Sequence, residues 1–103
     1  VRRFVRMAEE EVYKYKLAKS SAFKKDIKSL SAEEKEETKE VIRKLAKGEV
    51  LDEKYHDHQL LGKLKDFRDC HIRPDLVLIY RIKENILELY VYRIGTHSKL
   101  YKK

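Results

Sequence analysis

The chain has 103 residues, a formal net charge of +7, and charged and hydrophobic fractions of 42% each. This length allows one domain with a modest core, and no stretch approaches the ~20 apolar residues of a membrane-spanning helix. The N-terminal VRRFVRM lacks the apolar centre of a signal peptide, and the single cysteine, Cys70, rules out an internal disulfide. We therefore expect a cytoplasmic domain with no membrane partner, whose basic charge favours nucleic acid or serves general solubility.

The first thirty residues predict an extension, a strand and a short helix. Residues 1–12 are interpreted as an N-terminal extension, disordered or helical, that precedes a single domain over 13–103. Residues 13–18 (YKYKLA) alternate polar and apolar side chains, as a strand does. Ser20 or Ser21 can then cap a short helix whose apolar residues recur at i, i+4 and i+7.

A second, longer helix follows directly. Ser31 and Glu34 have the S-x-x-E spacing of a capping box, which predicts that the helix begins there. An apolar stripe runs from Thr38 to Ala46, glutamates occupy the first turns and basic residues the last, and Gly48 ends the pattern. The acidic middle of the chain is therefore mostly a solvated helix face.

The second half predicts three strands. They cover 67–72, the almost wholly apolar 76–82 and 86–94, with a hairpin loop at 83–85 and Pro74 between the first two. The order β-α-α-β-β-β indicates an α+β fold in which two N-terminal helices pack on one face of an antiparallel sheet.

Ionisable residues concentrate around these strands. His58 precedes them, His71 and Asp75 flank the turn at Pro74, and His97 follows the last strand. Hairpin pairing of the last two strands brings the residues after 94 back to the start of the apolar strand, so we expect His71, Asp75 and His97 to meet at one edge of the sheet.

Histidines and a carboxylate on a basic surface suit proton transfer on a phosphodiester. Cleavage of RNA by its own 2′-OH needs a base, an acid and positive charge at the phosphate, and it needs no metal or other cofactor. Histidine can supply either proton-transfer role near neutral pH. Arg68, Arg81 and Arg93 are candidates to hold the phosphate oxygens.

Each of these residues also has a plainer interpretation. His56 and His58 with Cys70 and His71 match no standard zinc spacing, so we expect no metal site, and Cys70 is interpreted as a packing residue. His71 can be structural, Asp75 can cap a turn, Asp69 can be an ordinary surface charge, and Tyr101 can close the core or stack on a base. From these residues alone, a nucleic-acid enzyme and a basic binding module stay close together.

Two motifs separate them. The pattern D-H-x-L-x-G-x(5)-R-D-x-H-I-x-P-D-x-x-L-I-Y from Asp57 to Tyr80, and R-x-G-T-H-S-x-L-(Y/F) from Arg93 to Tyr101, resemble the YafQ branch of the RelE toxin superfamily. The resemblance covers the C-terminal half with many residues at fixed spacing. It implies the microbial-RNase-like RelE fold for the whole domain.

The resemblance also implies an activity and partners. Such toxins of type II toxin–antitoxin systems cut mRNA in the ribosomal A site without a metal, which leaves a 2′,3′-cyclic phosphate and a 5′-hydroxyl and stops translation. The implied partners are a DinJ/RelB-like antitoxin, mRNA, ribosomal RNA and, through the antitoxin complex, operator DNA.

Carried onto this chain, the resemblance implies a set of site residues. The catalytic set is His58, His71, Asp75, His97 and Tyr101, and the substrate- or phosphate-binding set is Arg68, Asp69, Arg81 and Arg93. His97 and Asp75 are assigned to proton transfer, without deciding between base and acid. Two positions depart from the family: Leu76 stands where a tryptophan is known, and Tyr101 replaces a phenylalanine. Two alternatives remain, a related toxin that binds without cutting and a basic nucleic-acid-binding module.

Overall fold

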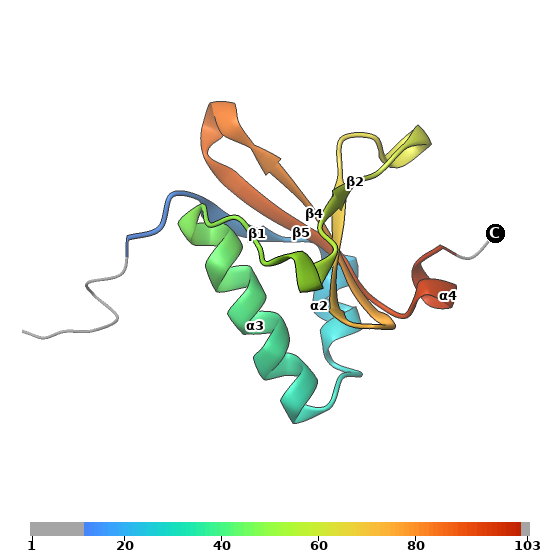
Figure 1. Cartoon of the computed structure of the whole chain (residues 1–103). Helices are drawn as coiled ribbons and strands as arrows, with labels where there is room; N and C mark the ends of the chain where they lie inside the picture. The colour runs from blue at the N-terminus through green and yellow to red at the C-terminus, as the bar shows by residue number, and fades with distance from the viewer. Residues whose placement is uncertain (1–11, 102–103) are drawn as a thin grey trace, which may run out of the picture.

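The computed structural model describes residues 12–101, so the expected extension lies outside it except for Val12. The elements are, in chain order, β1 (Lys16–Lys19), α2 (Ser21–Ile27), α3 (Ala32–Lys47), β2 (His58–Gln59), β3 (Arg68–Arg73), β4 (Leu76–Lys83), β5 (Glu88–Gly95) and α4 (His97–Leu100) (Figure 1). Short 3-10 turns cover Glu53–Tyr55, Gly62–Leu64 and Glu84–Ile86. Within this part of the chain, no helix has the length and apolar character needed to cross a membrane.

The five strands form one sheet in the order β1-β5-β4-β3-β2. Neighbouring strands are antiparallel except β1, which runs parallel to β5 with Lys16 opposite Glu88. The α+β class is confirmed, but the expectation of a purely antiparallel sheet is wrong: the sheet is mixed. The reason is that α2 and α3 connect β1 to the other strands of the sheet, and such a crossover connection allows parallel pairing.

The expected element order is also incomplete, because β2 and α4 were not anticipated. Both are too short to give a periodic pattern, with two and four residues. The predicted hairpin loop lies later than expected, since Lys83 belongs to β4 and Leu87 adopts a left-handed conformation at the turn. Other predicted ends differ by one to three residues, as is usual for element boundaries.

The two longer helices begin where their caps predict. Ser20 caps α2 by accepting from the Phe23 N–H. Ser31 and Glu34 form the complete capping box of α3. Gly48 ends α3 with a φ of 88°, a left-handed conformation that glycine adopts at little cost.

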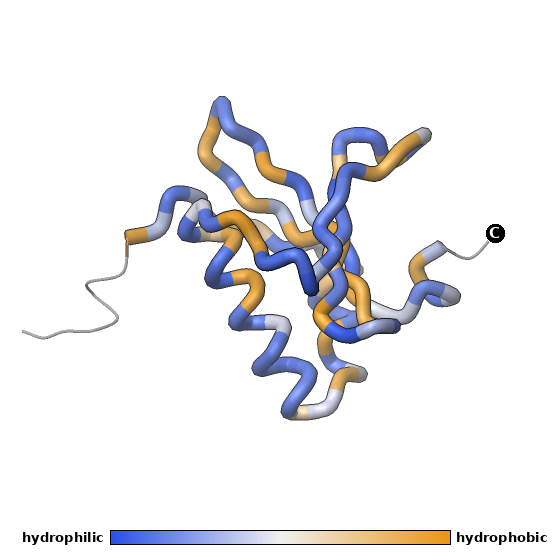
Figure 2. Tube along the Cα trace, viewed as in Figure 1, coloured by the Kyte–Doolittle hydropathy of each residue, from blue (hydrophilic) through white to orange (hydrophobic). Residues whose placement is uncertain are grey.

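The core lies between α2, α3 and one face of the sheet. Hydrophobic and hydrophilic residues alternate along β5 and the outer half of β4 (Figure 2), which allows one face of the sheet to pack on the helices. The buried residues include Phe23, Val41, Leu45, Leu78, Tyr80, Leu89, Val91 and Ile94. Figure 1 shows α4 well apart from α3. The segment that carries His97 therefore lies away from α3.

Candidate functional site

His97 and Asp75 form the centre of the site. The turn between β3 and β4 places Asp75, and Thr96 caps α4 so that His97 is its first residue. The His97 Nδ1 lies 2.7 Å from Asp75 Oδ1, and the backbone N–H of His97 donates to the same oxygen at 2.9 Å. These hydrogen bonds from His97 lower the pKa of Asp75, so the carboxylate is ionised at neutral pH. An ionised carboxylate favours a proton on Nδ1 and leaves Nε2 to face a substrate.

His71 lies against this pair from β3. Its ring centroid is 5.1 Å from that of His97 in an edge-to-face arrangement, and 5.4 Å from that of His56. Burial lowers the pKa of His71, although the nearby Asp69 carboxylate acts in the opposite direction. The neutral form of His71 is therefore favoured, and a neutral imidazole can accept a proton.

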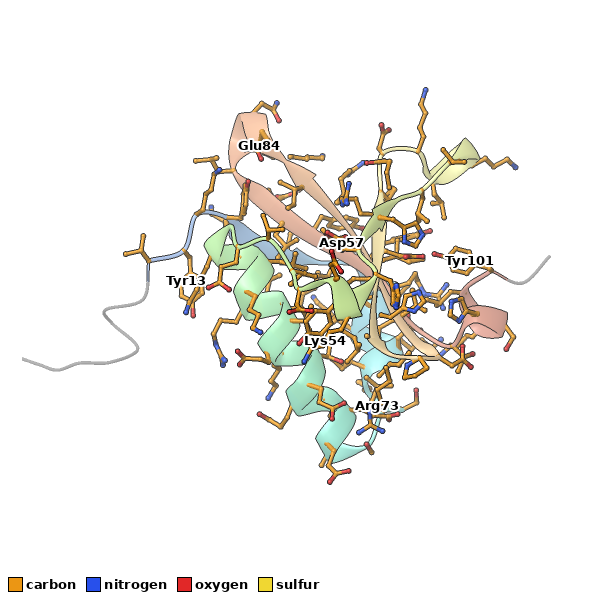
Figure 3. All side chains as sticks on the ribbon, viewed as in Figure 1. Tyr13, Lys54, Asp57, Arg73, Glu84 and Tyr101 are labelled. Carbon is orange, nitrogen blue, oxygen red and sulfur yellow. The ribbon has the colours of Figure 1, made fainter. Side chains whose placement is uncertain are left out.

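Asp69 links a third histidine and the C-terminal segment. It is 3% exposed, and its Oδ2 accepts a 2.6 Å hydrogen bond from the Tyr101 hydroxyl. Figure 3 shows Tyr101 reaching from the C-terminal segment toward the sheet. Burial and this hydrogen bond raise the pKa of Tyr101, so its hydroxyl keeps its proton. Asp69 was weighed as a surface charge, and the structure buries it instead.

The contact between His58 and Asp69 is electrostatic. His58 Nδ1 is 3.1 Å from Asp69 Oδ1, yet that oxygen receives no hydrogen bond within the described chain. The two observations agree because His58 Nδ1 lies 2.8 Å from the His56 carbonyl oxygen, to which its N–H is directed. His58 thus presents its remaining nitrogen to solvent, with 53% of the side chain exposed.

A cavity of about 810 Å³ adjoins the cluster, between α3 and β3. One wall carries His56, His58 and His71, and the opposite wall carries Glu37 and Glu40. Arg73 pairs with Glu37 at 2.7 Å, which binds the outer end of β3 to α3. A negatively charged phosphate is disfavoured beside the glutamates, so the histidine wall is the side on which a phosphate can lie.

The three candidate arginines lie in different environments. Arg68 Nε pairs with Asp57 at 3.2 Å, on the far side of β3 from Asp69. Arg93 makes a two-point contact with the buried Asp26 through Nε and Nη2, at 2.7 and 3.1 Å, and within residues 12–101 its Nη1 makes no hydrogen bond. Arg81 lies among aromatic rings with no carboxylate partner in residues 12–101. The structure therefore brings none of the three guanidinium groups into direct contact with the histidine cluster.

Sequence reasoning left three supporting residues without a role. His56 lies beside His71, with the two rings tilted, from a left-handed position at the end of the first 3-10 turn, and the His-x-His spacing was its signal. Asp57 accepts hydrogen bonds from both Tyr80 and Arg68. Asp26 anchors Arg93, and nothing in the helical pattern of α2 marks it as a buried residue.

Residues 12–101 contain no group of three or more His, Cys, Asp or Glu side chains arranged to hold a metal ion. Cys70 is fully buried, and burial raises the pKa of its thiol well above the ordinary range. It packs in the core as expected.

Comparison with known proteins places this chain in a family. Residues 15–102 match the family described as bacterial toxin of type II toxin–antitoxin system, YafQ. The mRNA interferase toxin YafQ of Escherichia coli K12 is 43% identical over 47 residues, which are 46% of this chain and 49% of that protein. The chain spans about half the length of the curated relatives it matches.

Solved structures agree over a longer stretch. The E. coli DinJ–YafQ toxin–antitoxin complex matches with a TM-score of 0.75 and 31% identity, covering 85% of this chain and 98% of that one. A metal-bound toxin from Helicobacter pylori matches with a TM-score of 0.74 and 38% identity, covering 84% and 98%. The fold is thus that of a small bacterial toxin of the type II class. The chain belongs to the YafQ family.

Proposed function

We propose that this protein is an endoribonuclease toxin that cleaves mRNA in the ribosomal A site and so inhibits translation. The observation that carries the proposal is the 2.7 Å contact between His97 Nδ1 and Asp75, beside His71. Family membership and the E. coli relative named an mRNA interferase support it. The charge of +7 suits a protein that works among RNA phosphates.

The chemistry is attack by the ribose 2′-oxygen on the adjacent phosphorus. His71, neutral because burial lowers its pKa, takes the proton of the 2′-OH. The P–O5′ bond then breaks, and His97 gives a proton from Nε2 to the leaving 5′-oxygen. The products are a 2′,3′-cyclic phosphate and a 5′-hydroxyl. No metal is required, since the nucleophile belongs to the substrate and both proton carriers belong to the protein.

The remaining residues orient these groups and the substrate. Asp75 holds His97 and orients its ring through the Nδ1 hydrogen bond. The N–H donors on Nη1 of Arg93 remain available to a non-bridging phosphate oxygen. His58 orients the nucleotide from the solvent side, and the half-buried ring of Tyr101 offers a surface on which a base can stack.

The toxin's partner is a cognate antitoxin that covers this site. The support is that the related E. coli YafQ is known in a complex with DinJ. Through the DNA-binding part of such an antitoxin, the complex represses its own operon. Antitoxin binding and RNA binding exclude each other if both use the cluster around His97.

The test is cleavage of mRNA on purified 70S ribosomes, mapped by primer extension. Wild type should cut at A-site codons, and His97→Ala should lose the cuts by a factor of 10² or more. Ser98→Ala, a neighbouring exposed residue of α4, is the matched control and should cut as wild type does. Cleavage on the acid side should fall as His71 becomes protonated.

Two outcomes would reject the proposal. A folded wild type that binds ribosomes and leaves mRNA intact would identify a toxin that binds without cutting. Cutting that survives His97→Ala would remove His97 from the chemistry. Circular dichroism of each variant separates lost chemistry from lost structure.

A further inference from the structure

We propose that Phe67, Arg81, Tyr90 and Tyr92, here called the aromatic–arginine platform, bind the single-stranded RNA next to the scissile phosphate by stacking on its bases. The inference rests on the proposed function and extends it from the reacting phosphate to the bases of the substrate. It concerns the face of the sheet that points away from α3, where the proposed mechanism gives the platform residues no role.

The strand register places the platform on that face. Leu78 and Tyr80 of β4 and Leu89 and Val91 of β5 belong to the core that packs against α3. Because successive strand residues point to opposite faces, Arg81 and Tyr90, which are direct partners, lie on the other face. The register shift between Ile79 and Tyr80 inserts Tyr92 as an extra residue beside them.

The four side chains contact one another closely. The Arg81 guanidinium carbon lies 5.0 Å from the Phe67 ring centroid and 5.5 Å from that of Tyr90. The centroids of Phe67 and Tyr92 are 5.0 Å apart, and those of Tyr90 and Tyr92 are 6.4 Å apart with a 28° angle between planes. None of the four belongs to the core cluster, and each keeps part of its surface open to solvent.

The charge of the platform favours an anionic partner. Arg81 forms no ion pair within residues 12–101, and its buried Nε has no hydrogen-bond partner there. Lys83 shares this face two residues further along β4, and Glu88 lies opposite both Lys83 and Lys16 at that end of the sheet. Aromatic rings beside an unpaired arginine are a combination that binds single-stranded nucleic acid without reading its sequence.

The platform is continuous with the candidate active site. Phe67 precedes Asp69 by two residues, roughly 7 Å along the strand. Asp69 faces Ile79 across the β3–β4 pair and holds Tyr101. A strand of RNA whose phosphate lies at His97 and His71 can therefore continue over Tyr101 onto the platform rings. An apolar protein partner would offer no negative charge to the unpaired arginine.

The experiment measures binding without cleavage. A fluorescent 2′-O-methyl oligoribonucleotide has no free 2′-OH to act as nucleophile, so anisotropy reports affinity alone. We expect Tyr90→Leu and Tyr92→Leu each to weaken binding roughly five- to hundredfold, the size of a lost base–aromatic contact. Tyr92→Phe, which keeps the ring, should bind as wild type does. Arg81→Gln should reduce the slope of log affinity against log salt by about 0.7, one phosphate contact.

Matched controls lie on the other side of the molecule. Tyr13→Leu and Arg43→Gln alter residues that line the pocket between β1, α2 and α3, and both should keep wild-type affinity. The inference is overturned if wild type fails to bind the oligonucleotide, if the platform variants bind as wild type does, or if Tyr13→Leu weakens binding equally. Binding that depends on the platform in a protein that cuts no mRNA would reject the proposed function and retain the platform.

Discussion

At the scale of single residues, Asp69 is a buried carboxylate whose hydrogen bonds are incomplete within the described chain. Oδ1 receives no hydrogen bond within the described chain, and Oδ2 receives one, from Tyr101. A buried carboxylate that loses its donor keeps the cost of desolvation without compensation. The hydroxyl that distinguishes Tyr101 from phenylalanine therefore stabilises this chain as well as the position of its C-terminal segment.

Tyr101→Phe tests this directly. We expect the free energy of unfolding to fall by about 1–3 kcal/mol, since Asp69 is left without a donor. The matched control is Tyr55→Phe, because Tyr55 is also half-buried and its hydroxyl makes no hydrogen bond within residues 12–101; its change should stay within about 0.5 kcal/mol. Urea denaturation at pH 7 measures both, and equal changes in the two variants would contradict the argument.

At the scale of elements, the position of His97 depends on how closely α4 packs on the end of β5. A Cβ placed at Gly95 would lie 3.2 Å from the Lys99 Cδ and 3.3 Å from the Leu100 Cδ2. Such contacts are tighter than ordinary van der Waals packing, so the Lys99 and Leu100 side chains of α4 have to shift by a few tenths of an ångström. Gly95 allows this close approach, and its backbone conformation is an ordinary one.

Gly95→Ala should therefore lower activity more than stability. We expect kcat to fall roughly tenfold, because a displaced α4 moves His97 relative to Asp75 and His71. The free energy of unfolding should change by about 1 kcal/mol or less, since α4 is short and its residues are exposed or half-exposed. Single-turnover cleavage and urea denaturation provide the two values. Unchanged kcat would show that α4 tolerates the shift.

Elements with a strong local signal were predictable from the sequence. The capping box at Ser31 and the stop at Gly48 fixed α3 to within a residue, and the apolar run of β4 identified the central strand. The parallel pairing of β1 was not predictable, because alternation indicates a strand without its partner or direction. β2 has two residues and exists through its pairing with Arg68 and Asp69.

The candidate site was predictable where it depends on hairpin pairing. Antiparallel β4 and β5 bring Asp75 and His97 together, as the spacing of the strands indicated. The surroundings of the arginines were not predictable, because they depend on packing between distant elements. Arg93 meets Asp26 from α2, and Asp69 is buried by Tyr101 from the far end of the domain.

At the scale of the whole molecule, the altered pKa values all place greatest stability near neutral pH. On the acid side, His71 and Asp26 have lowered pKa values. Burial lowers the pKa of His71. Burial alone would raise the pKa of Asp26, but hydrogen bonds from Arg93, the Ile94 N–H and Lys99 outweigh it and lower this pKa. A group with a lowered pKa stabilises the fold fully at pH values above the pKa that it has in the unfolded chain. This contribution is lost as the pH falls through the pKa that the group has in the folded protein.

The alkaline side follows the opposite rule. Burial raises the pKa of Cys70, Tyr80 and Tyr101. Their contributions to stability are complete below the ordinary pKa values, 9.0 for the cysteine and 10.0 for the tyrosines, and are lost at higher pH. We expect the free energy of unfolding to decline below about pH 6.5, further below about pH 4, and again above about pH 9. Urea denaturation across this range measures it, and Asp26→Asn should flatten the lowest step. A curve that rises steadily with pH would contradict this expectation.

The parallel pairing of β1 with β5 also governs when the protein can act. Lys16 pairs with Glu88, so the sheet cannot close until nearly the whole domain has been synthesised. His97 and Tyr101 come later still in the chain. A growing chain on the ribosome therefore contains no assembled site, and His97 and Asp75 meet only after β5 has joined β4. Under the function proposed above, a chain cannot cleave RNA until β5, α4 and Tyr101 have been synthesised.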